Sequence, residues 1–372
     1  MADIDKSLPN VKTSITVDPE EEIQIAEQKE VEASEEPVEV NPQEDGSVEI
    51  NFDPSKVNIE GTPSHFDNLA ELLPEDILDP IGSELVENYM DYKSSRKDWE
   101  QSYTTGLELL GFKYENRSEP FQGASGATHP VLAEAVTQFQ AGAYKELLPA
   151  EGPVRTQIVG NPDQNKEAQA QRVKDYMNYE LMEKMNEYEP EFDQMLFHLP
   201  LAGSTFKKVY YDDLLGRAVS KFVPADDLVV PYSATSLEDA EAIIQTIKIS
   251  ENDLRKQQVA GFYSDIELQK PHNISKDEIE NKERELEGTK KTGKQEMVYT
   301  LLECHVNLDL EGFEDKDQEL NETGIKLPYI VTVDESSRQV LSIRRNFEPT
   351  DAKKNKIQYF VHFKFLPGLG FY

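Results

Sequence analysis

"FQGASGATHPVLAEAVTQFQAGAYKEL", residues 121–147, joins a loop with two glycines to an apolar helix. Such a loop can hold a phosphate, because small residues let backbone N–H groups face outward and the helix that follows adds its positive N-terminal end. A Walker-type loop needs a lysine after its last glycine, and none follows Gly126. A dinucleotide-binding fingerprint needs a third glycine and a leading hydrophobic strand, and both are lacking. The loop is therefore interpreted as structural.

The helix after this loop is predicted from its start signals and its periodicity. Thr128 fits the N-cap position, and Pro130 fits the first helical turn. One apolar stripe repeats at helical spacing and consists of Leu132, Val136, Phe139, Ala143 and Leu147.

The composition is that of a protein with a sizeable core and a strongly charged surface. The 372 residues include 72 acidic and 38 basic side chains, a net charge of -34. This charge argues against a protein that coats nucleic acid or an anionic membrane, so any DNA contact must be local. The single cysteine, Cys304, excludes an internal disulfide. No stretch approaches the roughly 18 apolar residues of a membrane span.

The first part of the chain lacks the side chains that build a core. Residues 1–60 contain 17 acidic and 4 basic side chains, a net of 4 - 17 = -13, and Phe52 is the only aromatic residue. Too little apolar surface is present to offset the entropy of ordering. We expect residues 1–65 to form a disordered acidic arm.

Residues 66–249 predict an α+β domain. Helical spacing begins with Leu85, Tyr89, Tyr92, Arg96, Trp99 and Tyr103. A short strand is expected at 154–159. A long helix follows, with the stripe Val173, Tyr176, Met177, Leu181, Met185 and Tyr188, and Pro190 is expected to break it. A hairpin around Gly216, a strand at 228–230 and another at 241–250 complete the domain.

The remaining sequence changes character twice. Residues 250–296 predict a helix that starts at the N-cap Ser250 and ends at Gly261, and then a polar stretch at 273–294 that forms either a surface helix or a linker. Residues 297–372 are β-rich, with a half-buried strand at 297–310, a hairpin around Glu335 and Ser336, and a strand at 357–365. The apolar ending "FLPGLGFY" predicts that the chain is a C-terminally truncated fragment.

Catalytic or metal-binding patterns are weak throughout. Six scattered histidines show no zinc-ligand spacing, and His305 is expected on the polar face of its strand. Asp226 and Asp227 form an acidic pair that suits Mg²⁺ or acid–base chemistry, but neighbours on a strand point to opposite faces, so a turn is favoured. We therefore predict no enzyme activity and no cofactor.

A basic tract stands out near the end. Residues 326–372 carry 8 basic and 4 acidic side chains, a local 8 - 4 = +4. The cations interleave with aromatic residues, a composition typical of contacts with nucleic acid or an acidic protein. A solvated hairpin rim is the alternative. The candidate contact residues are Arg338, Arg344, Arg345, Lys353, Lys354 and Lys356.

Three segments resemble the portal proteins of short-tailed double-stranded-DNA bacteriophages. They are "PFQGASGATHPVLAEAVTQFQAGAYKELLPAEGPVRTQIVG" (120–160), "FVPADDLVVPYSATSLEDA" (222–240) and "YFVHFKFLPGLGFY" (359–372). The resemblance runs from about residue 69 to the end. It implies an α+β wing for 66–249, a segment toward the stem for 250–296 and a clip-like region for 297–372.

The same resemblance implies function and partners. Portal proteins form a ring, usually of twelve subunits, at one capsid vertex, through which DNA is packaged and ejected. The implied partners are other copies of the chain, the terminase large subunit, the head-tail adaptor, capsid and scaffolding proteins, and double-stranded DNA, but no membrane. The implied location is the virion, and the host cytoplasm during assembly. Expected subunit-packing residues are Gly123, Gly126, Ala135, Phe139 and Gly142.

Two alternatives remain open. The first is an acidic capsid-assembly or scaffolding protein that forms no ring. The second is a metal-dependent hydrolase that uses Asp226 and Asp227.

Overall fold

A computed structural model describes residues 39–42, 48–51, 64–110, 121–124, 129–212, 215–269, 278–287, 298–316 and 322–366. The chain divides into two compact units, residues 1–67 and 68–372. In the first unit, β1 (Glu39–Pro42) and β2 (Val48–Asn51) pair as an antiparallel hairpin. Most of the predicted acidic arm lies outside the described residues.

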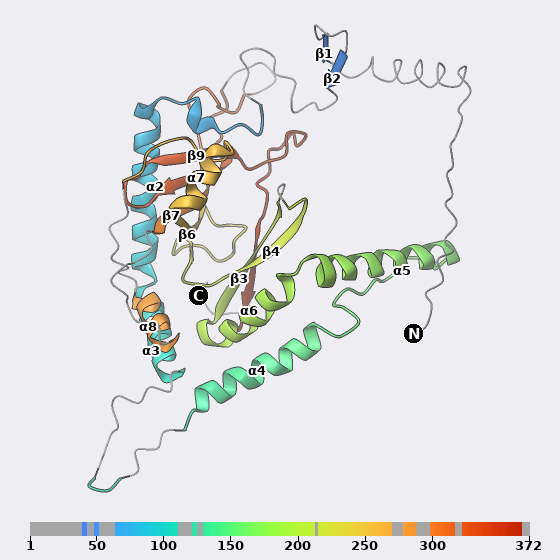
Figure 1. The fold of residues 1–372 in the computed structure, drawn as a ribbon, viewed down its shortest axis with the longest axis vertical. Coiled ribbons are helices and arrows are strands. Elements are labelled where there is room, and N and C mark those ends of the chain that lie inside the picture. Colours follow the sequence, from blue (N-terminus) through green and yellow to red (C-terminus); the bar gives the residue numbers. More distant parts are fainter. Residues whose placement is uncertain are drawn as a thin grey trace, which may run out of the picture. The chain divides into compact units, whose positions relative to one another are not determined.

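The second unit is mixed α and β, as the sequence predicts. Its described helices (Figure 1) are η2 (Leu69–Glu71), α2 (Glu75–Ser95), α3 (Lys97–Leu110), α4 (Val131–Leu147), α5 (Gln164–Tyr179), the π-helix η3 (Glu180–Lys184), α6 (Tyr188–Ala202), α7 (Glu251–Val259) and α8 (Glu278–Glu287).

Two antiparallel sheets form the β part of this unit. The five-stranded sheet has the order β5-β6-β7-β8-β9, and its strands are β5 (Leu228–Val229), β6 (Ala242–Ser250), β7 (Val298–Leu308), β8 (Leu327–Asp334) and β9 (Val340–Arg345). The three-stranded sheet has the order β10-β3-β4, and its strands are β3 (Ser204–Asp212), β4 (Arg217–Val223) and β10 (Phe360–Lys364).

The predicted stripe through α2 and α3 lies against these sheets. Leu85 and Tyr89 of α2 are buried on the five-stranded sheet, and Tyr103 of α3 packs with Phe206 of β3. Gly82 permits the close approach of α2 to the hairpin between β8 and β9, because a Cβ there would lie 2.1 Å from a backbone carbonyl oxygen. The helical spacing of apolar residues in the sequence thus predicts correctly which face of α2 and α3 is buried.

A side-chain amide closes the outer edge of β9. Asn68 Nδ2 donates to the carbonyl oxygen of Leu341 at 3.1 Å, and its Oδ1 accepts from the N–H of Ile343 at 2.9 Å. The same oxygen caps η2 at Ala70. This arrangement gives the exposed backbone groups of an edge strand partners within the chain.

Several local predictions hold and others need correction. Ser250 caps α7 by accepting from the N–H of Asp253, and Gly216 occupies the β3–β4 turn with φ 61°. Residues 154–159 form no strand, and the long helix ends before Pro190, which lies in the first turn of α6. β7 is buried on both faces, so His305 lies inside the protein and not on a polar face.

The sheets join segments that are distant in the sequence. β5 and β6 precede the predicted linker, whereas β7, β8 and β9 follow it, and all five belong to one sheet. β10 pairs with β3 and not with its sequence neighbour β9. The portal-type subdivision into 66–249, 250–296 and 297–372 stays a prediction.

Candidate functional site

The first candidate surface is the basic tract, which begins at the β8–β9 hairpin. Arg338 has a φ of 61°, and its guanidinium pairs with Glu87 of α2 at 3.1 Å. At the end of β9, the Arg344 guanidinium lies 4.5 Å from the ring centroid of Phe262. It also donates to the carbonyl oxygens of Gly261 at 3.3 Å and Phe262 at 3.1 Å, just after α7. Arg344 is therefore held in place by stacking and by carbonyl groups near a helix C-terminus.

The other cations of the tract point to different elements. Arg345 lies 5.3 Å from the ring centroid of Phe313, and Lys354 pairs with Asp315 in the same loop. Lys356 is half-buried, and burial lowers the pKa of its ammonium. Lys353 is exposed. The structure thus brings Arg345 and Lys354 to one loop, but it does not gather all six predicted cations into one patch.

The second candidate surface is the face of α4 predicted to pack against another subunit. Ala135 and Gly142 are exposed, and a Cβ on Gly142 would meet open space. Phe139 is half-buried and makes an edge-to-face contact with Phe365 at 5.2 Å. Gly123 adopts a φ of 86° in the preceding loop, and Gly126 lies outside the described residues. α4 therefore presents a face of small residues to solvent.

α5 (Gln164–Tyr179) is a second exposed helix. None of its side chains is buried, although the sequence predicts an apolar stripe there. Val173, Tyr176 and Met177 are 44%, 60% and 45% exposed. The side chain of Asn178 anchors the helix, because it accepts from the N–H of Val154 at 2.9 Å and donates to its carbonyl oxygen at 3.3 Å. α5 thus carries an apolar stripe that no described part of the chain covers.

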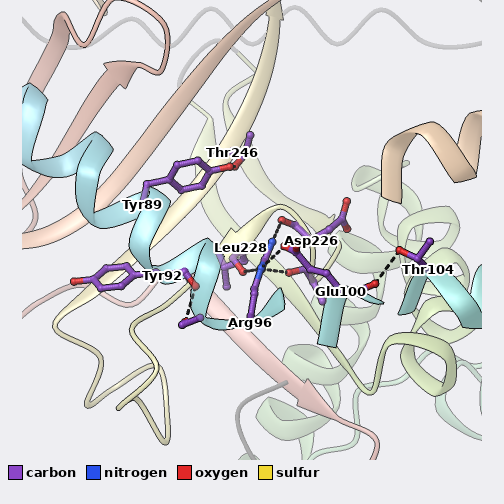
Figure 2. A network of polar contacts seen from close by, with 10 residues as sticks. Tyr89, Tyr92, Arg96, Glu100, Thr104, Asp226, Leu228 and Thr246 are labelled. Carbon is purple, nitrogen blue, oxygen red and sulfur yellow. Dashed lines mark hydrogen bonds and ion pairs between the residues drawn. The ribbon is translucent and has the colours of Figure 1, made fainter. Parts of the chain in front are cut away.

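The acidic pair of the hydrolase alternative lies in the turn between β4 and β5, as the sequence predicts. Figure 2 shows Arg96, at the junction of α2 and α3, directed into this turn. Its guanidinium donates to the carbonyl oxygens of Ala225 at 2.9 Å, Asp226 at 2.5 Å and Leu228 at 2.9 Å. It also pairs with Glu100 at 3.0 Å. A buried arginine thus fixes the turn that contains the acidic pair.

No metal-binding arrangement accompanies these residues. Within the parts of the chain that the structure describes, no three His, Cys, Asp or Glu side chains lie close enough to hold a metal ion. The arrangement around Asp226 serves to position backbone, because the arginine donates to carbonyl oxygens of the turn.

A polar cluster between the two sheets was missed by the sequence reasoning. Lys208 Nζ of β3 lies 2.5 and 2.7 Å from the carboxylate oxygens of Glu303 in β7, and His305 Nε2 lies 2.8 Å from the same carboxylate. Burial alone would raise the pKa of Glu303, but His305 and Lys208 outweigh it and lower the pKa to about 2. Burial lowers the pKa of His305. The only sequence signal for this cluster is the alternation of polar and apolar residues in β7, and that pattern by itself predicts polar side chains that face solvent.

This cluster has the character of a structural joint. Lys208 and Glu303 side chains are only 15% and 16% exposed, and His305 packs against the ring of Phe360 at 5.1 Å. A buried ion pair whose charges are also hydrogen-bonded fixes geometry more than it adds stability. It holds β3 of one sheet against β7 of the other.

No helix among the described residues has both the length and the apolar character needed to cross a membrane. Comparison of the chain with models of known protein families and with curated proteins finds no match.

Proposed function

We propose that this chain is a subunit of a portal-type ring, through which double-stranded DNA is packaged into and ejected from a short-tailed bacteriophage capsid. The observation that carries the proposal is the uncovered stripe of α5. A helix of about 16 residues is marginal in water without a packing partner. Because α5 buries no side chain against the part of the chain that the structure describes, a second subunit is the natural source of that partner surface.

The exposed face of α4 supplies a complementary surface. Small residues at Ala135 and Gly142 allow a second helix to approach closely, whereas Val173 and Met177 of α5 supply apolar area. Contact between two different surfaces of the same chain is heterologous, and repetition of such a contact closes into a ring when the rotation allows it. The segment resemblance described above supports this form of assembly.

The charge distribution also supports the proposal. Basic surfaces retain DNA because binding releases counterions, and a chain of net charge -34 disfavours such binding. This suits a channel through which DNA moves. The basic tract then belongs to docking of the terminase motor or the head-tail adaptor, because rim charges mainly steer and orient an acidic partner. Arg344 is available for that role in a fixed position, because it stacks on Phe262 and donates to two carbonyl oxygens.

Negative-stain imaging of the full-length protein tests the proposal. Annular particles with a central hole are expected. The double variant Val173→Asp with Met177→Asp should abolish them, because it places two charges on the apolar stripe. The matched variant Gln164→Asp with Gln171→Asp adds the same charge to the opposite face of α5 and should leave the rings intact. Absence of rings from the unmodified protein would favour the scaffolding alternative, and rings in the first variant would show that α5 is not the contact.

A further inference from the structure

β4 is the outer strand of the three-stranded sheet, so one edge of its backbone pairs with no other strand of that sheet. Because residues of an antiparallel strand alternate in direction, Ala218, Ser220 and Phe222 direct their backbone groups away from β3. Such an edge is a ready template for another extended chain.

Side chains contact one backbone group at each of these three positions. The N–H of Phe222 donates to the Glu191 carboxylate at 2.7 Å. The Arg217 guanidinium lowers the pKa of the Glu187 carboxyl group, and the backbone N–H of Ser220 contributes to this lowering. Arg217 pairs with both oxygens of Glu187 at 2.6 and 2.9 Å, and it also donates to the carbonyl oxygen of Ala218 at 3.3 Å. Two carboxylates, one at the N-cap of α6 and one in its first turn, thus lie at the edge where a strand would otherwise pair.

The side of α6 that faces the sheet packs against a buried lysine, Lys207 of β3. The rings of Tyr188 and Phe192 stack on each other at 6.0 Å, and Lys207 Nζ lies 4.3 Å and 5.0 Å from their centroids. Lys207 is 4% exposed, and its ammonium has no hydrogen-bond partner among the described residues. The charges of Glu191 and Glu187 face it. Aromatic contact and charge attraction, without a directed hydrogen bond, therefore hold these turns on the sheet.

The start of α6 is also the end of an interrupted helix. η3 is a five-residue π-helix, and the residues Met185–Glu187 between it and α6 are not helical. π-helical turns and helix breaks are frequent at functional joints. The carboxylates that contact β4 thus lie next to this interruption of the helix.

We propose that the outer edge of β4 is a docking site for an extended acidic segment of a partner protein, and that the first two turns of α6 close this site until they are displaced. The chemistry of the occupant follows from the edge. β4 contains Arg217 and Lys221 and no acidic residue, in a chain of net charge -34. The N–H of Phe222, which points away from β3, already donates to a carboxylate. An acidic strand that pairs with the edge would replace Glu187 and Glu191 and add main-chain hydrogen bonds.

Peptide binding and amide exchange test this proposal on the whole chain. The probe is an eight-residue peptide of alternating threonine and glutamate. The variant Glu187→Gln with Glu191→Gln weakens the closing contacts, so it should bind the probe at least tenfold more tightly than the unmodified protein. Without the probe, exchange of the Ser220 and Phe222 amides should accelerate in this variant. With the probe, exchange should slow again, because the peptide now accepts those N–H groups.

Three controls separate edge pairing from general effects. The variant Glu167→Gln with Glu183→Gln removes the same charge from exposed positions and should bind the probe as the unmodified protein does. A peptide of alternating proline and glutamate keeps the acidic charge but cannot pair as a strand, and it should not bind. The single variant Glu191→Gln keeps the Arg217–Glu187 pair, so it should accelerate exchange at Phe222 and not at Ser220.

Four results would contradict the proposed docking site on β4. Unchanged exchange at both amides in the double variant, or equal binding of the proline peptide, would overturn the proposal. So would an equal gain in the exposed-site variant, because charge alone would then explain the binding. Exchange that accelerates across β7 and β8 as well would also refute it, because the two carboxylates would then support the whole unit and not a displaceable cover.

Discussion

Replacement of Lys207 by methionine should stabilise the protein at neutral pH. Burial lowers the pKa of this ammonium from 10.5 to about 8. Each pKa unit corresponds to about 1.4 kcal/mol, so the protonated form costs about 3 kcal/mol relative to the unfolded state. The contacts with Tyr188 and Phe192 return about 1–2 kcal/mol of this, since they are desolvated cation–π contacts. A net gain of about 1–2 kcal/mol in the free energy of unfolding is expected for Lys207→Met.

The pH dependence of this gain follows from the direction of the shift. Between about pH 8 and 10.5 the folded protein has lost the Lys207 proton, whereas the unfolded chain still binds it. The unfolded state then holds more protons, so the stability of the unmodified protein rises with pH in this window. The advantage of the methionine variant should therefore be full below about pH 8 and should fall steadily as the pH rises towards 10.5.

Urea denaturation measures this effect, with the fluorescence of Trp99, the one tryptophan, as the signal. The neighbouring change Lys208→Met is the matched control. It leaves the buried carboxylate of Glu303 without its lysine, so stability should fall by about 3 kcal/mol or more. A loss of stability in Lys207→Met at pH 7, or a gain that does not vary between pH 8 and 10.5, would refute the reasoning.

Three further changes have defined outcomes. Gly82→Ala should lower the free energy of unfolding by about 2 kcal/mol, because its Cβ would lie 2.1 Å from the carbonyl oxygen of Arg338 and the clash exceeds the helix-propensity gain; an unchanged urea midpoint would contradict this. Arg96→Lys keeps the charge but loses the fork of carbonyl bonds, so a calorimetric loss of about 2–4 kcal/mol is expected, and full stability would exclude the role given to it. Arg344→Glu with Arg345→Glu should weaken binding of the motor or adaptor to purified rings, most strongly at low salt; unchanged partner binding with reduced DNA retention would assign the tract to the duplex.

The elements predicted correctly from the sequence are those with local causes. The buried face of α2 and α3 follows from helical spacing at Leu85 and Tyr89, and the start of α7 follows from the Ser250 cap. The β3–β4 hairpin follows from Gly216, whose positive φ suits a tight turn. In each case the decisive residues lie within a few positions of one another, so a single sequence contains the whole signal.

The features that the sequence does not predict depend on contacts between residues that are far apart in the chain. The alternation of polar and apolar residues predicts that His305 faces solvent. The charge that accompanies Glu303 and His305 inside the protein comes from Lys208, on a strand far away in the sequence. The pairing of β10 with β3 has the same origin, because a strand pattern does not specify its partner. An apolar stripe likewise does not distinguish a core from a subunit contact, and Val173 of α5 shows this ambiguity.

The two ends of α6 are held in different ways, which links the proposed subunit contact to the proposed docking edge. At the C-terminal end, the N–H of Gly203 donates to the Leu199 carbonyl oxygen at 2.9 Å with φ 82°, and β3 begins at the next residue. The indole of Trp99 donates to the Ala202 carbonyl oxygen at 3.0 Å and fixes this end further. The N-terminal end rests on Lys207 through ring contacts and on β4 through two carboxylates. Because one end is continuous with a strand and the other adjoins a π-helical turn, we expect a force on α5 to act first at the carboxylates that contact β4. Docking of α5 on a neighbouring subunit would therefore change access to the β4 edge before it disturbed the sheet.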